Sequence, residues 1–151
     1  MSWEALSAVT KTLDANQQMA HVGDVRQAVR FAVSDLKGQQ LLPGFCLPKG
    51  ITPILPIFRE AILNGLPEVK EQAAQGLGEV IKLTSAQALQ PSVVHITGPL
   101  IRILGDRFNW NVKAAVLETL ALLLEKVRKN CYKKIFWPRL IKINFFRLVL
   151  C

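Results

Sequence analysis

The chain has 151 residues, of which 50% are hydrophobic, so it is long and apolar enough to form one domain with a buried core. Its net charge of +8 is confined to one end: residues 1–127 hold 12 basic and 11 acidic residues, whereas residues 128–151 hold seven basic residues and no acidic one. The nearly neutral body lacks the positive surface that nucleic-acid binding normally requires, and the three scattered cysteines fit neither a disulfide framework nor a zinc site. There is no secretory signal and no apolar run of roughly 18 residues, so we expect a cytoplasmic protein.

Residues 1–40 are expected to form a helical hairpin of degenerate sequence. Regularly spaced apolar residues predict amphipathic helices over residues 2–18 and 20–37. Gly38 is a suitable stop after the second helix. The apolar positions are Trp3, Leu6, Val9 and Leu13 in the first helix, and Val22, Val25, Val29, Ala32, Val33 and Leu36 in the second.

Residues 41–52 form a connector that is too rich in proline and glycine to continue a helix. Two prolines and two glycines fall between Leu42 and Gly50. Because Phe45 is apolar, we expect the connector to pack onto the body. Cys46 lacks the basic neighbours that activate a thiol, so we expect it to be buried and unreactive.

The rest of the body contains two segments that repeat each other at an offset of 43 residues. Each segment is expected to hold two helices joined by a turn. In the first segment one helix spans residues 53–64 and the other starts near residue 69. In the second segment they span residues 98–107 and 112–127. A short helical turn is expected within residues 85–97. The matching positions are Pro56 and Pro99, Arg59 and Arg102, Val69 and Val112, Lys70 and Lys113, and Leu77 and Leu120.

A pair of helices repeated every 40–47 residues or so is typical of HEAT and armadillo arrays. We therefore predict HEAT repeats over residues 53–84 and 85–127. Together with the N-terminal hairpin they would form an all-α, HEAT/armadillo-like solenoid of about three helical hairpins. Solenoids of this kind stack their repeats and present a long surface to other proteins. The fold class thus favours binding over catalysis.

No pattern of catalytic or cofactor-binding residues interrupts this interpretation. His21 and His95 are isolated from other metal ligands, and no nucleophile, zinc-protease or paired-carboxylate motif is present. Gly76 and Gly78 lie inside a helical pattern, which favours close helix packing over a phosphate-binding loop. We expect no enzyme, no cofactor and no small-molecule substrate.

Charged positions in the repeats have two alternative roles. Lys70 and Lys113 follow the turn of each repeat, where a basic residue can bond an acid or a carbonyl; Asp106 is a candidate partner for Lys113. A structural role is favoured for both lysines. Arg102 and Arg107 are the better candidates for a protein-binding surface, the alternative being an ordinary solvated face.

The tail of residues 128–151 mixes seven basic residues with aromatic and aliphatic ones. Such a composition is compatible with a peripheral membrane or RNA-binding segment. It is also compatible with intron read-through, since Lys126-Val127-Arg128 can be encoded by a splice-donor sequence. In that case the chain could be a non-functional truncated product.

Several stretches resemble a known family. They are SWEALSAVTKTLDA (2–15), LPGFCLPK (42–49), LTSAQALQPSVV (83–94), ITGPLIRILGDRF (96–108) and NVKAAVLETLALLL (111–124). These stretches are similar to the very large HEAT-repeat activators of the initiation-factor-2-alpha kinase, and the similarity covers about residues 1–127. The resemblance implies a piece from the C-terminal part of such an activator, flanked by neighbouring HEAT repeats. It also implies, as partners, translating ribosomes and the N-terminal RWD domain of the kinase during amino-acid starvation.

Overall fold

The computed structural model describes residues 8–9, 11–36, 38 and 40–128, and every regular element in this part of the chain is a helix. The predicted all-α class is therefore confirmed, while the tail beyond residue 128 lies outside the described residues. The elements are α2 (Ala15–Ala20), α3 (Val22–Ser34), the 3-10 helix η1 (Pro43–Cys46), α4 (Leu55–Asn64), α5 (Pro67–Leu83), α6 (Ala86–Leu89), the 3-10 helix η2 (Gln90–Ser92), α7 (Val93–Gly105) and α8 (Trp110–Arg128).

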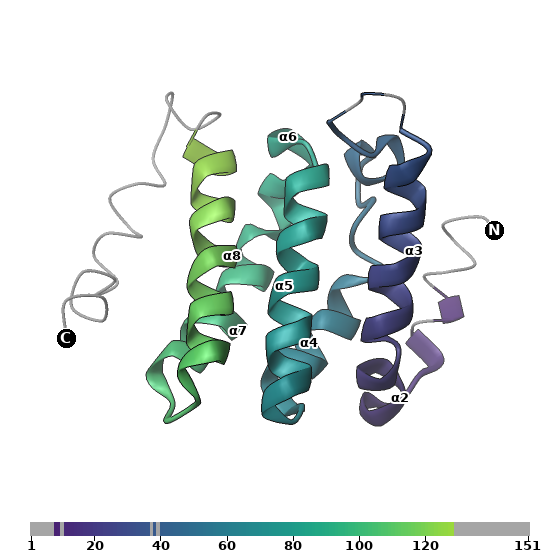
Figure 1. The fold of residues 1–151 in the computed structure, drawn as a ribbon. Helices are drawn as coiled ribbons and strands as arrows, with labels where there is room; N and C mark the ends of the chain where they lie inside the picture. Colours follow the sequence, from purple (N-terminus) through teal and green to yellow (C-terminus); the bar gives the residue numbers. More distant parts are fainter. Residues whose placement is uncertain (1–7, 10, 37, 39, 129–151) are drawn as a thin grey trace.

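Consecutive helices pair into stacked hairpins: α2 with α3, α4 with α5, and α7 with α8. The second helices of these pairs, α3, α5 and α8, lie side by side in one layer, and α4 and α7 lie in a layer behind them (Figure 1). The central helix α5 packs against α3, α4 and α8. Each hairpin thus buries its apolar face on its neighbours, as a solenoid requires.

The offset of 43 residues is retained in the second helices of the repeats. Helix α5 begins at Pro67 and α8 begins at Trp110, and 110 − 67 = 43. Leu77 and Leu120, which match at this offset, are both buried. This pair of leucines therefore occupies equivalent core positions in the two repeats.

The first helices of the repeats differ from each other, and the predicted start of α7 at Gly98 is wrong. Helix α7 begins at Val93 and carries Pro99 in its interior. Val93, Ile96 and Leu100 are all buried and recur at helical spacing, so the apolar stripe continues upstream of the proline. The expected helical turn before α7 is present as α6 and η2.

The predicted uninterrupted helix over residues 2–18 is also wrong in its described part. The chain breaks at Leu13, and α2 starts anew at Ala15 because Asp14 forms a capping box. The Asp14 carboxylate accepts a hydrogen bond from the Gln17 backbone N–H (2.8 Å), and the Gln17 side chain accepts one from the Asp14 N–H (3.1 Å). This reciprocal pair satisfies backbone donors that would otherwise be unpaired and favours a new helix start.

The connector packs onto the body, as predicted. Phe45 of η1 is buried, and the backbone N–H of Leu42 donates to the carbonyl of Leu83 at the end of α5 (2.9 Å). Cys46, which was expected to be buried, is a half-buried free thiol. The connector is therefore fixed to the solenoid at the level of α5.

Helix α5 approaches its neighbours closely at Gly76. A β-carbon at this position would lie 2.8 Å from Cε1 of Phe58 and 2.7 Å from Cγ of Arg26. On the other side of α5, the Thr119 hydroxyl of α8 donates to the carbonyl of Ala74 at 2.7 Å. These distances support close helix packing as the reason for glycine in α5.

Candidate protein-binding site

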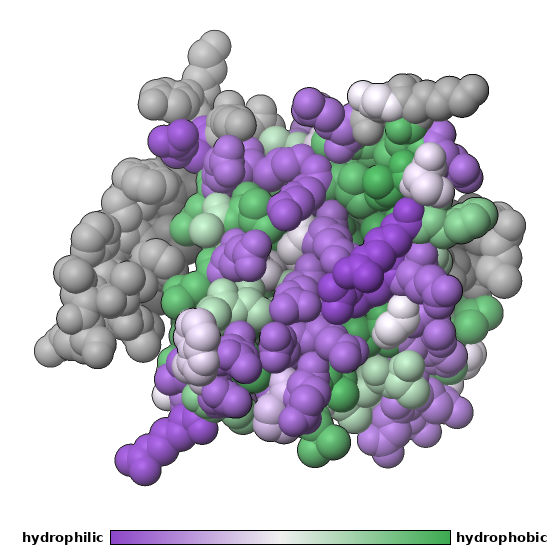
Figure 2. All heavy atoms as spheres, in the orientation of Figure 1, coloured by the Kyte–Doolittle hydropathy of each residue, from purple (hydrophilic) through white to green (hydrophobic). Residues whose placement is uncertain are grey.

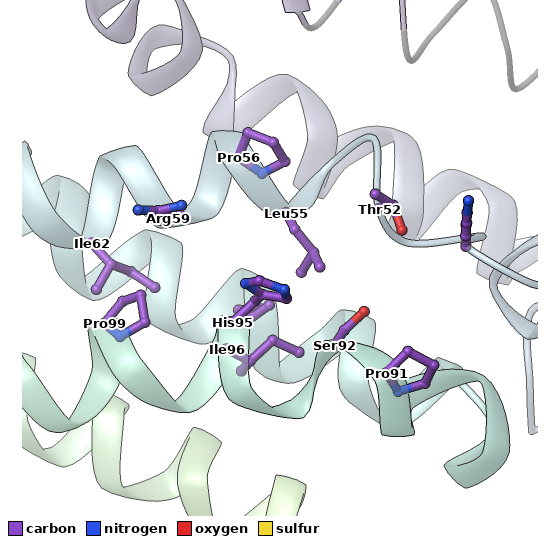
Figure 3. A pocket seen from close by; sticks show the side chains of 12 residues that line it. Thr52, Leu55, Pro56, Arg59, Ile62, Pro91, Ser92, His95, Ile96 and Pro99 are labelled. Atoms are coloured by element: carbon purple, nitrogen blue, oxygen red, sulfur yellow. The ribbon is translucent and has the colours of Figure 1, made fainter.

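The surface of the α4–α7 layer is hollowed between the two helices. One hollow of about 430 Å³ lies between α4, α7 and the end of the connector (Figure 3). A second hollow of about 280 Å³ adjoins it and shares Arg59, His95 and Pro99 with it. We refer to the two together as the α4–α7 groove. Its lining residues are Lys49, Thr52, Leu55, Pro56, Arg59, Ile62, Leu63, Leu77, Pro91, Ser92, Val94, His95, Ile96, Gly98, Pro99 and Arg102.

The repeated sequence element lines this groove from both sides. Pro56 and Arg59 belong to α4, and their counterparts Pro99 and Arg102 belong to α7. Residues three apart lie on the same face of a helix, so each proline and its arginine point the same way. Figure 3 shows Arg59, Pro56 and Pro99 around the hollow. The 43-residue repeat therefore places two prolines and two arginines in one groove.

The charged residues that line the groove are all cationic. They are Lys49, Arg59 and Arg102, and no aspartate or glutamate lines either hollow. All three side chains are exposed, and none of them forms a salt bridge within the described part of the chain. Beneath these charges the groove is apolar, with Leu55, Ile62 and Ile96 contributing. The site thus combines unpaired positive charge with an apolar floor.

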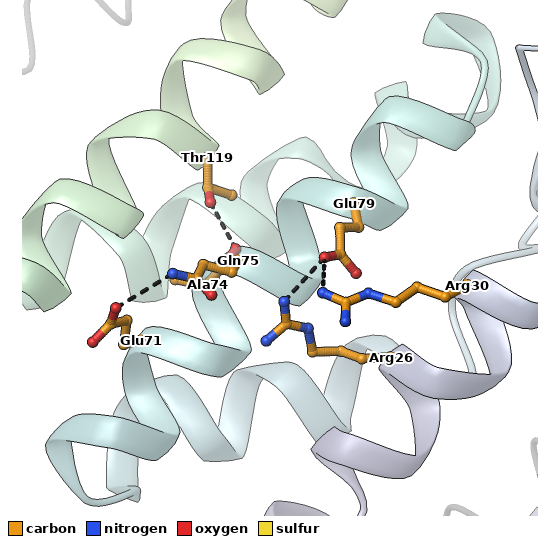
Figure 4. A network of polar contacts seen from close by, with 7 residues as sticks. All are labelled: Arg26, Arg30, Glu71, Ala74, Gln75, Glu79 and Thr119. Carbon is orange, nitrogen blue, oxygen red and sulfur yellow. Dashed lines mark hydrogen bonds and ion pairs between the residues drawn. The ribbon is translucent and has the colours of Figure 1, made fainter. Parts of the chain in front are cut away.

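The opposite layer contains arginines that are paired. Glu79 of α5 accepts hydrogen bonds from Arg26 (3.0 Å) and Arg30 (2.8 Å) of α3 (Figure 4). Burial opposes ionisation of Glu79, but the two guanidinium groups outweigh it and lower the pKa of this carboxyl. In turn, the hydrogen bond to Glu79 raises the pKa of Arg30. The face formed by α3, α5 and α8 carries mainly hydrophilic side chains (Figure 2). These ion pairs join two hairpins, and each of the two arginines has a carboxylate partner in Glu79.

Lys70 has a structural position in the first turn of α5, just after the connection from α4. Its side chain is only 4% exposed, and its Nζ donates to the carbonyls of Ile62 (2.8 Å) and Leu63 (2.7 Å) at the end of α4. The ammonium also lies 4.8 Å from the centroid of the Phe108 ring in the next repeat. Burial lowers the pKa of Lys70, while the nearby Asp106 carboxylate opposes that shift.

The equivalent residue, Lys113, is half-buried, and its side chain makes no such contact with the residues that the structure describes. Within the described residues no salt bridge joins Lys113 to Asp106. The Asp106 carboxylate instead attracts the ammonium group of Lys70. The suggested pairing of Asp106 with Lys113 is therefore not present. The reason is that the α7–α8 turn brings Phe108 and Asp106 toward the preceding repeat.

Other kinds of site find little support in the part of the chain that the structure describes. No group of three or more His, Cys, Asp or Glu side chains there could hold a metal ion. None of the helices in the same residues is long and apolar enough to cross a membrane. We therefore take the α4–α7 groove as the candidate recognition site.

Comparisons with known proteins agree with the stacked hairpins. A family model described as stalled ribosome sensor GCN1-like HEAT repeats matches residues 1–49. The chain is 64% identical over 127 residues to Stalled ribosome sensor GCN1 of Mus musculus and 62% identical to that of Homo sapiens. It is 35% identical over 126 residues to eIF-2-alpha kinase activator GCN1 of Saccharomyces cerevisiae. This chain belongs to the GCN1 family.

Each of these matches covers 83% of the chain but only 5% of the relative. The chain therefore spans a small fraction of the length of the GCN1 proteins that it matches. No solved structure matched the chain.

Within this GCN1-family segment, the two arginines proposed from the sequence lie in different places. Arg102 lies on α7 and lines the groove. Arg107 is exposed in the turn between α7 and α8 and lines neither hollow. Sequence reasoning did not single out Lys49 and Arg59 as binding residues. Arg59 could have been found, because it is the 43-residue counterpart of Arg102, whereas no sequence signal marked Lys49.

Proposed function

We propose that the chain is a non-catalytic scaffold segment that binds the N-terminal RWD domain of the initiation-factor-2-alpha kinase through the α4–α7 groove. The groove carries three exposed cations without salt-bridge partners over an apolar floor, and this observation supports the proposal most directly. The Saccharomyces cerevisiae and Dictyostelium discoideum relatives are named eIF-2-alpha kinase activator GCN1, which supports an eIF-2-alpha kinase as the partner. The choice of its N-terminal RWD domain rests on the resemblance to those activators.

The proposed setting is translation control during amino-acid starvation, in the cytoplasm. The mouse and human relatives are named as stalled ribosome sensors, so the ribosome is a second proposed partner. The chain covers 5% of those relatives, so ribosome binding is also a proposal, and we place it second. Neighbouring HEAT repeats are the third proposed contact, since solenoid repeats bury their end faces on one another.

A calorimetric titration of the purified RWD domain into the full chain tests this function. We expect saturable binding that Arg102→Gln weakens and that the matched control Lys82→Gln leaves unchanged. Lys82 is exposed on α5 and lines a separate hollow beside Glu79, away from the groove. Arg107→Gln tests whether the contact extends to the α7–α8 turn. Absence of binding by a chain that circular dichroism shows to be helical would refute the proposal.

A further inference from the structure

The repeated Pro-x-x-Arg element gives the groove two similar halves. One half is formed by Pro56 and Arg59 of α4, and the other by Pro99 and Arg102 of α7. Arg59 and Pro99 line both hollows, so the halves are continuous. Such a ladder of equivalent groups on adjacent repeats suits a ligand whose own recognition groups recur along an extended backbone.

We propose that the α4–α7 groove binds an extended acidic segment of a partner protein. Carboxylates of the segment pair with Arg59 and Arg102, and an apolar side chain of the segment packs between Pro56 and Pro99. This inference rests on the proposed function, because it specifies the kind of segment that the same surface accepts.

Charge complementarity identifies the segment as acidic. Arg26 and Arg30 on the other layer already share the Glu79 carboxylate, whereas Arg59 and Arg102 have no such acid within the described residues. An arginine presents a planar fork of donors that matches a carboxylate in a bidentate fashion. Lys49 adds a third positive charge at the connector end of the groove.

Two other occupants fit the groove less well. Single-stranded nucleic acid binds through stacking of bases on aromatic side chains, and no Phe, Tyr or Trp lines either hollow. The segment of residues 128–151 holds seven basic residues and no acidic one, so its charge has the same sign as that of the groove. A partner peptide that carries both carboxylates and apolar side chains matches both features of the groove.

Fluorescence anisotropy with synthetic peptides tests this inference on the full purified chain. The probe is a labelled peptide in which Glu and Leu alternate, and the comparison probes replace Glu by Lys or Leu by Ser. A labelled oligouridine serves as the nucleic-acid probe. The protein variants are Arg59→Gln, Arg102→Gln and the matched control Lys82→Gln, each checked for helical content by circular dichroism.

We expect saturable binding of the Glu/Leu peptide, weaker binding of the Glu/Ser peptide and no binding of the Lys/Leu peptide. Each arginine substitution should weaken binding by about tenfold, because a charge-assisted hydrogen bond is lost, and Lys82→Gln should have no effect. Absence of Glu/Leu binding, equal effects of all three substitutions, or binding of oligouridine alone would overturn the inference.

The RWD domain separates this inference from the proposed function. If the peptide binds but the RWD domain does not, the kinase partner is wrong and the acidic-segment site stands. If the RWD domain binds but the Glu/Leu peptide fails to displace it and Arg59→Gln has no effect, the kinase partner stands and the inference is overturned.

Discussion

Replacement of Gly76 by alanine should destabilise the solenoid despite the higher helix propensity of alanine. Alanine in a helix interior is favoured over glycine by about 1 kcal/mol. At Gly76, however, the new β-carbon would lie 2.8 Å from Cε1 of Phe58, which is fully buried, and 2.8 Å from Cδ of Arg26. Ordinary carbon–carbon contacts are about 3.5–4.0 Å, so the phenyl ring or the helix must move by most of an ångström.

The magnitude follows from these two opposing terms. Overpacking of this size costs about 1–3 kcal/mol, and the helix-propensity gain of about 1 kcal/mol offsets part of it. The Arg26 stem can move, but its guanidinium is held by Glu79 at 3.0 Å, so its movement weakens that ion pair. We expect the free energy of unfolding to fall by about 1 kcal/mol, the middle of the range that remains.

Gly78→Ala is the matched control because it lies in the same helix and gains the same propensity. Its nearest neighbours would be Oγ1 of Thr119 at 3.3 Å and Cδ1 of Leu122 at 3.4 Å, both at the ends of side chains. Urea denaturation followed by circular dichroism should therefore show Gly76→Ala to be less stable than Gly78→Ala. If Gly76→Ala unfolds at the same urea concentration as Gly78→Ala or a higher one, the argument for close helix approach at this glycine is refuted.

Three further contacts are tested by substitution in the same unfolding assay. The pKa of Glu79 is lowered in the folded chain, so its carboxylate stabilises the fold above its ordinary pKa of 4.5, and this contribution is lost as the pH falls below that value. Glu79→Gln should therefore make the free energy of unfolding depend less steeply on pH below 4.5. An unchanged pH dependence would contradict this. Lys70→Met removes the two hydrogen bonds that Lys70 donates to α4 carbonyls and should lower the free energy of unfolding by about 2 kcal/mol. Lys113→Met should change it by less than about 0.5 kcal/mol. Equal effects of the two substitutions would contradict a structural role that is specific to Lys70. The Thr119 hydroxyl lies 2.7 Å from the Ala74 carbonyl oxygen and 2.9 Å from that of Ala115. Thr119→Val removes this buried donor and should cost about 1 kcal/mol, whereas Thr119→Ser keeps it; equal stability of the two variants would contradict a stabilising role for the hydroxyl.

Local sequence signals predicted the second helices of the repeats well, because their buried residues depend on periodicity alone. The 43-residue match of Lys70 with Lys113 gave the correct relative start of α5 and α8. It did not predict their unequal contacts. Lys70 meets Phe108 of the following repeat, and this contact depends on the conformation of the α7–α8 turn, which no repeat pattern encodes.

The candidate site was only partly predictable for a related reason. Arg102 could be singled out from the sequence, but the groove forms where α4 and α7 lie side by side and where the connector brings Lys49 to one end. The relation between Arg59 and Lys49 arises from tertiary packing, since they lie on different elements. Similarly, the early start of α7 depends on burial of Val93 and Ile96, which outweighs the helix-disrupting effect of Pro99.

If the α4–α7 groove is the surface that contacts the kinase, binding of the RWD domain must shield its backbone from solvent. Hydrogen–deuterium exchange of the full chain, with and without the RWD domain, tests it most directly. We expect slower exchange in α4, α7 and the connector near Lys49 when the RWD domain is bound, with little change at the solvent-facing ends of α3. Protection confined to α3, α5 and α8, or no protection at saturating RWD domain, would contradict it.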